Sequence, residues 1–161
     1  MFSKFVLSYD HRVDEKYIQV IKKFLNENGF GCFEISLNDD ENNDYPILAS
    51  RAYQTFLKEK CDGMILLCGT GVGMNVVANK CDGIRSVLPS EEGSAYFARR
   101  DEDANCIVFA AGKADERYEV KICKRKMIRI LDVFINTEFL GEERHARRIG
   151  QISKIEKGGK L

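Results

Sequence analysis

The feature that most limits the possible fold is an apolar run that passes directly into a glycine-rich turn. The run covers residues 64–67 (MILL), and the turn covers residues 68–74 (CGTGVGM). An apolar run bounded by turn residues is typical of a strand buried in a parallel sheet. The glycines let the backbone turn sharply, and a helix is expected to begin near Met74. A strand, turn and helix in this order direct several backbone N–H groups toward one point, where negative charge is stabilised.

A cysteine, Cys68, stands where the expected strand meets the turn. Because it faces these N–H groups, Cys68 is expected to have a depressed pKa and to carry thiolate near neutral pH. A thiolate base beside an anion-stabilising loop suits proton transfer between carbons through an enediolate. The same turn could hold a phosphate without catalysis, and a buried cysteine often acts only as a small apolar side chain. The turn lacks the dinucleotide and P-loop signatures, so by itself it leaves both interpretations open.

Length and composition indicate one globular domain over residues 1–161. The chain has 161 residues, of which 44% are hydrophobic and 31% charged, and this is ordinary for a folded protein with its own core. The formal net charge is zero, so overall charge gives no reason to expect a nucleic-acid or anionic-membrane partner. Apolar stretches also stay well short of a membrane span.

The cysteines and histidines give no sign of a metal site. No two cysteines form a C-x-x-C pair, and the chain has only two histidines, so neither a metal nor a cofactor is expected. A thiol redox enzyme is disfavoured because Cys68 has no second cysteine two or three residues away. The N-terminal residues do not resemble a signal peptide, and the reducing cytoplasm is the expected compartment.

Strand-like and helical patterns alternate along the whole chain. Strands are expected near residues 5–7, 32–35, 63–68, 84–88 and 106–110, with helices near 17–25, 44–60, 74–79, 90–100, 118–135 and from 142 onward. This alternation predicts an α/β fold, namely a Rossmann-like three-layer sandwich with a five-stranded parallel sheet. Ligands of such sheets bind at the carboxyl ends of the strands. We therefore expect Asp10, His11, the 68–73 turn and the loop after Leu88 to share one edge.

Taken in order, these motifs resemble the type B ribose-5-phosphate isomerase family, which also contains the galactose-6-phosphate isomerase subunits. The resemblance runs over nearly the whole length, and several motifs at matching spacing are more specific than any one of them. The matching segments are Asp10-His11, Asp44-Tyr45-Pro46, Cys61-Asp62-Gly63, residues 68–74, Ala78-Asn79-Lys80, Gly83-Ile84-Arg85, Asp103-Ala104-Asn105, Asn136-Thr137-Glu138-Phe139 and Arg144-His145-Ala146-Arg147-Arg148.

The resemblance implies a metal-free aldose–ketose isomerase whose default substrate is ribose 5-phosphate. In this family the cysteine of the glycine turn, here Cys68, takes the proton from the carbon next to the carbonyl, and Thr70 assists proton movement. The turn then holds the enediolate oxygens through its backbone amides, and stabilising such an oxyanion is usually the largest catalytic effect. The positions that the resemblance assigns to this amide group are Gly69, Gly71, Val72 and Gly73.

The resemblance also implies which residues bind the sugar and its phosphate. Asp10 matches a residue that hydrogen-bonds sugar hydroxyls, while His11, Arg144 and Arg148 match the phosphate-binding set. The two arginines are four residues apart and so share one helix face, as a clamp for a dianion would require. Tyr45, Asn79 and Glu102 complete the substrate-binding positions. His145 either binds phosphate or braces the last helix, and the sequence leaves both open.

Two segments depart from the family pattern. Asp101 and Glu102 stand where the family usually has a His-Asn pair that opens the sugar ring and contacts substrate, generally from the neighbouring subunit. An ordinary aspartate is ionised at pH 7, so Asp101 would open the ring by accepting a proton, or by donating one if burial raised its pKa. After residue 110 the family's Gly-x-Arg turn is missing, and Lys113 and Arg117 are the candidate replacements for its arginine.

Because of these departures from the family pattern, we consider alternatives to an isomerase of ribose 5-phosphate. A six-carbon or modified sugar phosphate, of the galactose 6-phosphate or allose 6-phosphate type, is the first alternative substrate. A non-catalytic sugar-phosphate-binding subunit is the second alternative, whereas a nucleotide-binding module is disfavoured by the turn sequence. The expected partners are the small-molecule sugar phosphate and further copies of the chain. The resemblance implies a homodimer or homotetramer with the active site at the subunit interface and the C-terminal helix, about 142–157, packed on a neighbour.

Overall fold

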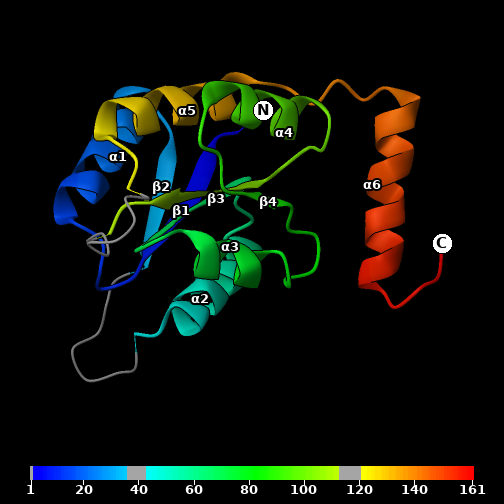
Figure 1. Ribbon diagram of the computed structural model, residues 1–161, viewed down its shortest axis with the longest axis horizontal. Helices are drawn as coiled ribbons and strands as arrows, with labels where there is room; N and C mark the ends of the chain where they lie inside the picture. Colours follow the sequence, from blue (N-terminus) through cyan, green and yellow to red (C-terminus); the bar gives the residue numbers. More distant parts are fainter. Residues whose placement is uncertain (1, 36–42, 113–120) are drawn as a thin grey trace.

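A five-stranded, all-parallel sheet forms the centre of the computed structural model, in the order β2-β1-β3-β5-β4 (Figure 1). The structure describes residues 2–35, 43–112 and 121–161. The strands are β1 (Lys4–Tyr9), β2 (Gly31–Ile35), β3 (Gly63–Cys68), β4 (Ser86–Val87) and β5 (Cys106–Ala110). The helices are α1 (Glu15–Glu27), α2 (Tyr45–Lys58), α3 (Val72–Ala78), α4 (Glu92–Arg100), α5 (Lys124–Asn136) and α6 (Glu143–Glu156). The α/β sandwich expected from the sequence is confirmed.

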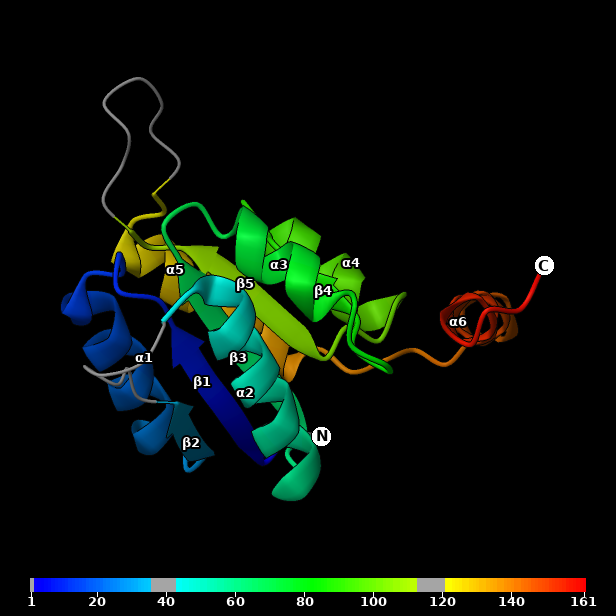
Figure 2. The ribbon, with the colours of Figure 1, turned by 90° about the horizontal axis from the view of Figure 1, so that it is seen from below.

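Helices cover both faces of the sheet, and each face has its own apolar core. Helices α1, α4 and α5 lie on one face, and α2 and α3 lie on the other (Figures 1 and 2). The central strand β3 is buried along its whole length, with alternate side chains entering the two cores. This double burial explains why its sequence is an unbroken apolar run and does not alternate between apolar and polar residues.

The strand order reverses between β1 and β3, and this reversal fixes the place of the site. From β1 the chain runs first to β2 at one edge and then returns to β3 on the other side of β1. The connections leave β1 and β3 toward opposite faces, because α1 belongs to one core and the helix after β3 to the other. A crevice therefore opens between the carboxyl ends of β1 and β3, where ligands of open α/β sheets bind.

Three local expectations require correction. Strand β4 covers only Ser86–Val87, not residues 84–88, because it lies at the sheet edge and pairs with β5 alone. Helix α5 begins at Lys124, and residues 121–123 are not helical, because Ile122 donates its N–H to the carbonyl of Ala110 at the end of β5. An aspartate directly before Tyr45-Pro46 predicts a helix start capped by its carboxylate. Asp44 does occupy the N-cap position of α2, but its side chain makes no capping hydrogen bond.

The last helix, α6, stands away from the body of the molecule (Figures 1 and 2). Only one of its side chains, His145, is buried, while Ile152 and Ile155 remain exposed. Near its C-terminal end the Glu156 carboxylate accepts a hydrogen bond of 3.0 Å from the Gly83 N–H. An amphipathic helix normally packs its apolar side chains against a core, but α6 leaves most of them exposed to water. None of the helices in the described ranges has the length and apolar character needed to cross a membrane.

An arginine network fixes the loop between α4 and β5. The side chain of Arg99 is almost completely buried, lies over the Phe2 ring and forms an ion pair of 2.9 Å with Asp103. The other oxygen of Asp103 pairs with Arg85, also at 2.9 Å. Asp103 has a positive φ of 47°, a conformation that costs free energy outside glycine, so these ion pairs hold the turn. The Asp101–Glu102 segment is therefore held in a defined position next to this network.

Candidate active site

The turn after β3 can be built only with glycine at its centre. Gly71 has a φ of +77°, and a Cβ there would lie 2.5 Å from the Leu88 Cδ1 atom and 3.2 Å from the Ala110 nitrogen. The left-handed backbone conformation and this crowding each disfavour any other residue. The turn therefore packs directly against the end of β5, and Val72 starts the short helix α3.

Cys68 lies at the end of β3 under this turn. Its side chain is buried, and the Gly71 N–H donates a hydrogen bond of 3.1 Å to its sulfur atom. The hydroxyl of Thr70 accepts a hydrogen bond of 3.3 Å from the Val72 N–H, which leaves its own proton available for donation. The sequence expectation that the thiol and the loop amides face one another is thus met in the structure.

The expected depression of the Cys68 pKa is wrong. Burial raises the pKa of the Cys68 thiol, because the thiolate loses its hydration, and the negative charge of Asp10 raises it further. Amide hydrogen bonds from Met74, Gly71 and Thr70 act in the opposite direction, but they do not outweigh the burial. The sequence indicated the converging amides but not the loss of water, and loss of water is the larger effect.

The end of β1 supplies the opposite wall of the site. Asp10 is buried, and its carboxylate accepts a hydrogen bond of 2.9 Å from the Arg12 N–H. Its backbone N–H bonds to the Leu67 carbonyl, so this turn is tied directly to β3. His11 and Arg12 follow as exposed side chains. The wall therefore presents a buried carboxylate and two groups that can bind anions at the surface.

A small pocket of about 190 Å³ lies between these walls. It brings together seven of the residues expected from the sequence and two others, Arg12 and Asp44. Its lining residues are Asp10, His11, Arg12, Asp44, Tyr45, Cys68, Gly69, Thr70 and Gly73. Sequence analysis did not single out Arg12, although its position directly after Asp10 and His11 at the end of a strand was a usable signal.

Tyr45 reaches the pocket because Gly73 makes room for its ring. A Cβ at Gly73 would lie 2.8 Å from the Cε2 atom of Tyr45, closer than real Cβ contacts allow. The first residue of α2 therefore packs on the first turn of α3, and the tyrosine side chain covers one side of the pocket. This pair of helices also shares one apolar core, which fixes the contact.

Asn79 and Glu102, both expected to bind substrate, lie outside the pocket. Asn79 bonds to the edge strand: its side-chain nitrogen donates to the Ser86 carbonyl at 3.0 Å, and its oxygen accepts from the Ser86 N–H at 2.9 Å. Glu102 is exposed after α4 and lines a different cavity. The observed contacts thus give Asn79 a structural task in positioning β4.

Asp101 is also outside the pocket, and its neighbour is His145. The Nε2 atom of His145 lies 3.7 Å from an Asp101 oxygen and 3.8 Å from a Glu142 oxygen, and Arg100 forms an ion pair of 3.0 Å with Asp101. His145 is 5% exposed, and within the described structure neither of its ring nitrogens has a hydrogen-bond partner. Its position between α6 and the end of α4 agrees with a residue that braces the last helix.

The two arginines expected to bind phosphate lie on α6. Both are exposed, and Arg144 pairs with Glu142 at 2.8 Å. Because α6 stands away from the sheet, neither arginine lines the Cys68 pocket of its own chain (Figure 1). Lys113 and Arg117, the candidate replacements after β5, lie outside the described residues.

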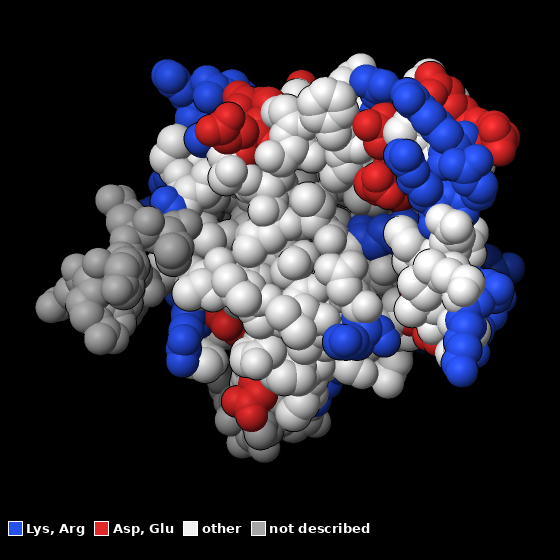
Figure 3. All heavy atoms as spheres, turned by 45° about the vertical axis from the view of Figure 1, so that its right-hand side comes forward, with Lys and Arg blue, Asp and Glu red and all other residues white. Residues whose placement is uncertain are grey.

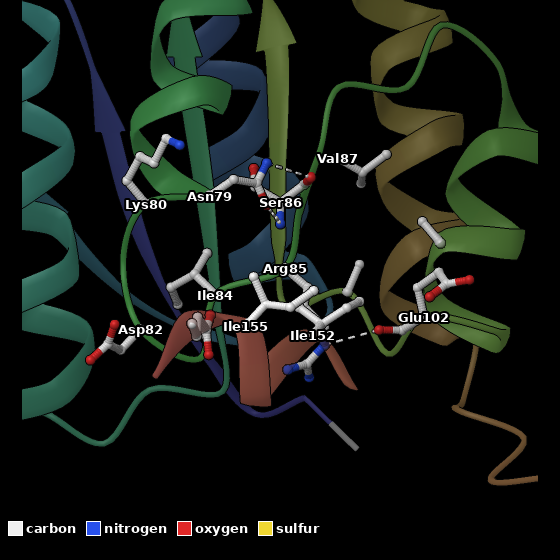
Figure 4. A pocket seen from close by; sticks show the side chains of 13 residues that line it. Asn79, Lys80, Asp82, Ile84, Arg85, Ser86, Val87, Glu102, Ile152 and Ile155 are labelled. Carbon is white, nitrogen blue, oxygen red and sulfur yellow. Dashed lines mark hydrogen bonds between the residues drawn. The ribbon is translucent and has the colours of Figure 1, made fainter. Parts of the chain in front are cut away.

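A larger groove of about 560 Å³ lies between α6 and the body, and Cys68 is not among its lining residues (Figure 4). Ile152 and Ile155 of α6 face Ile84 and Arg85 across it, with Glu102 at one side. Its lining includes charged side chains but neither a cysteine nor a histidine; the charged ones are Lys80, Asp82, Arg85, Glu102 and Glu156. Ile84, Ile152 and Ile155 contribute to the apolar part of the groove, and exposed apolar surface of this kind is typical of contacts between proteins. Within the described part of the chain, no group of three or more His, Cys, Asp or Glu side chains is arranged to hold a metal ion.

Comparison with known proteins connects this geometry to one family. Residues 6–152 match the family model described as Ribose/Galactose Isomerase. The chain is 35% identical over 132 residues to ribose-5-phosphate isomerase B of Escherichia coli K12, a match that covers 82% of this chain and 83% of the relative. It is also 26% identical over 147 residues to a putative sugar phosphate isomerase of Rickettsia conorii, covering 91% and 95% of the two chains.

Solved structures give the same result. The ribose 5-phosphate isomerase of Thermotoga maritima superimposes with a TM-score of 0.81 at 32% identity, covering 94% of this chain and 98% of the other. The type B ribose 5-phosphate isomerase of Trypanosoma cruzi superimposes with a TM-score of 0.82 at 29% identity, covering 98% and 99%. The resemblance stated from the sequence motifs is thereby confirmed.

The raised pKa of Cys68 predicts how its alkylation depends on pH. The rate of its reaction with iodoacetamide should keep rising through neutral pH and past the ordinary thiol value of about 8.5, because only the thiolate reacts. Asp10→Asn should shift this profile to lower pH, since the Asp10 charge contributes to the raised pKa. Mass spectrometry of the Cys68 peptide over a pH series measures both. Asp132→Asn, on the exposed side of α5, is the matched control, and a profile that levels off below pH 8 would contradict the raised pKa.

Proposed function

The chain belongs to the Ribose/Galactose Isomerase family and is an aldose–ketose isomerase, and we propose that it interconverts an aldose phosphate and its ketose phosphate with Cys68 as the base. Ribose 5-phosphate and ribulose 5-phosphate are the proposed pair. The observation that carries the mechanism is the Cys68 thiol, buried beneath the amides of a glycine turn and open to the pocket beside Asp10.

The proposed reaction proceeds through an enediolate. The Cys68 thiolate takes the proton from carbon 2 of the open-chain aldose, and the electrons of that C–H bond form the double bond between carbons 1 and 2. The negative charge moves to the carbonyl oxygen, where amides of the 69–73 turn stabilise it, at about 3–4 kcal/mol for each good donor. Return of a proton to carbon 1 gives the ketose. Thr70, whose hydroxyl proton is free to donate, moves a proton between the two oxygens.

This mechanism uses a thiol and amides and assigns no step to a metal ion. Because its pKa is raised, the Cys68 thiolate is a stronger base. For the same reason, a smaller fraction of Cys68 is deprotonated at neutral pH. Asp10 lies in the same pocket and is available to accept hydrogen bonds from sugar hydroxyls, as the family resemblance implies. A buried carboxylate of this kind favours hydroxyl groups over apolar substituents, because hydroxyl groups can donate further hydrogen bonds to it.

We propose that the active site is shared between two copies of the chain. The phosphate-binding assignment of Arg144 and Arg148 requires both to reach a Cys68 pocket, and α6 holds them away from the pocket of their own chain. A second copy related by two-fold symmetry would present its α6 to this pocket, and each copy would do the same for the other. The Asp101–Glu102 segment, next to the start of α6, would approach the same pocket.

The exposed apolar surface supports this arrangement. Val72 and Val76 on α3 and Tyr96 and Phe97 on α4 all remain exposed. Figure 3 shows a broad surface with few charged side chains on the side of the molecule that carries α6. Exposed apolar areas bordered by charge are typical of protein–protein interfaces, and burying them against a second copy would also fill the groove beside α6. The six free thiols favour a reducing compartment, and we place the enzyme in the cytoplasm.

One observation favours a second candidate function. Asp101 replaces the histidine that the family uses to open the sugar ring, and without ring opening a furanose cannot react at carbon 2. A chain that binds the cyclic sugar phosphate but does not isomerise it would be a binding subunit. A six-carbon or modified sugar phosphate is the remaining alternative substrate for the reshaped site.

The isomerase proposal predicts turnover that depends on Cys68. Five- and six-carbon aldose phosphates are assayed for ketose formation, with and without a metal chelator. Cys68→Ala should lower kcat about 100- to 10,000-fold, because it removes the general base. Cys32→Ala, which removes an exposed cysteine on β2, should leave kcat unchanged. Equal turnover in the Cys68→Ala variant and the wild type would contradict the assignment of the base.

The shared-site proposal predicts recovery of activity in a mixed dimer. Cys68→Ala and Arg148→Ala chains, each nearly inactive alone, are co-expressed with different tags and the heterodimer is purified. One of its two sites would contain an intact Cys68 and an intact Arg148, so it should show about half of the wild-type activity. A heterodimer of Cys68→Ala and Thr70→Ala is the matched control, because both changes lie in the same pocket and should give no recovery. No recovery in either heterodimer would contradict a site shared across the interface.

A further inference from the structure

Arg12 is the residue of the pocket that neither the motifs nor the proposed mechanism uses. Its side chain packs against Gly69, the first glycine of the turn. A Cβ built on Gly69 would lie 3.3 Å from the Arg12 Cδ atom and 3.9 Å from an Nη atom. Arg12 is exposed and lines the pocket with Cys68, His11 and Asp10. The guanidinium is thus held beside the reaction centre and in contact with solvent.

The guanidinium of Arg12 is not neutralised by an ion pair within the described structure. The carboxylate of Asp10, two residues away in the chain, accepts the backbone N–H of Arg12, and its charge acts on Cys68. Asp44 is the other acidic residue that lines this pocket. An arginine beside a pocket with no carboxylate partner can offer a planar, bidentate set of donors to an anion.

At the end of the neighbouring strand β5, the described backbone leaves no room for a side chain at Gly112. Gly112, which follows β5, bridges to Val13, and a Cβ on Gly112 would lie 2.3 Å from the Gly69 Cα atom. That backbone is packed against the turn, so no side chain fits there. Lys121 is engaged elsewhere, 3.8 Å from Asp14 and over the Tyr17 ring. Among the described residues around this edge of the pocket, Arg12 is the strong cation that remains available.

The geometry points to Arg12 as a phosphate-binding residue that each chain contributes to its own pocket, next to His11. This assignment rests on the proposed function and deepens it. The reacting carbons must lie at Cys68, deep in the pocket, so the phosphate at the other end of the open-chain sugar lies at the mouth. Arg12 and His11 are the exposed side chains of that wall. The ligand class is a phosphate monoester dianion, which a guanidinium binds through two parallel hydrogen bonds.

Substitution of Arg12 separates phosphate binding from chemistry. Arg12→Gln and Arg12→Lys are compared with wild type for turnover of ribose 5-phosphate and of ribose, which lacks the phosphate. Arg12→Gln should raise KM for ribose 5-phosphate about 10- to 100-fold, as expected for loss of charge-assisted hydrogen bonds, and leave kcat and the turnover of ribose nearly unchanged. Arg12→Lys should recover part of the loss. Arg129→Gln, which removes an exposed guanidinium from α5, is the matched control.

Binding of inorganic phosphate gives a second readout that does not need turnover. Titration followed by phosphorus NMR should show weaker phosphate binding in Arg12→Gln than in wild type and Arg129→Gln. If Arg12→Gln lowered the turnover of ribose and of ribose 5-phosphate equally, or left KM for ribose 5-phosphate unchanged, the assignment would be overturned. If wild type isomerises no sugar phosphate, the proposed function fails. The Arg12 assignment is then decided by the titration, where equal phosphate affinity in wild type and Arg12→Gln would overturn it.

Discussion

Close backbone packing around the turn after β3 is the constraint on which the rest of the site depends. Gly71 meets the end of β5, Gly112 meets Gly69, and Gly73 meets the ring of Tyr45, each at a distance that a side chain would prevent. These contacts hold four segments together at the reversal point of the sheet: the ends of β1, β3 and β5 and the start of α2. Close-packed backbone thus fixes the positions of the side chains that line this small pocket.

This packing also sets the chemistry of Cys68. Bringing the thiol under the turn gives it amide hydrogen bonds and removes its water, and removal of water is the stronger influence on its pKa. A proton on carbon is only weakly acidic, so a base with a raised pKa is suited to remove it, provided that the developing oxyanion is stabilised by the same amides. In the proposed mechanism, the same turn thus affects both the base and the intermediate. The anionic end of the substrate requires a separate set of cations, for which Arg12 and the α6 arginines are proposed.

Much of the fold was predictable because its signals are local. The apolar run of β3 and the turn after it predicted a parallel sheet, which is confirmed, and the Cys68 pocket lies at the carboxyl edge of this sheet, where a site was expected. Three features depended on distant parts of the chain and were not predicted correctly or at all. The sign of the Cys68 pKa shift depends on total burial, the position of Arg12 over Gly69 depends on how β1 and β3 meet, and the short β4 depends on its place at the edge. The position of Arg144 and Arg148 away from the pocket follows from the path of α6, which local helical periodicity does not specify.

The central claim, that Cys68 moves a proton on carbon, is tested most directly by hydrogen exchange. Ribose 5-phosphate is incubated with the protein in deuterated water, and the signal of the proton on carbon 2 is followed by NMR. The account predicts that this proton is replaced by deuterium with wild type and retained with Cys68→Ala at the same protein concentration. Retention with wild-type protein that binds the sugar phosphate would contradict the claim and favour a binding subunit.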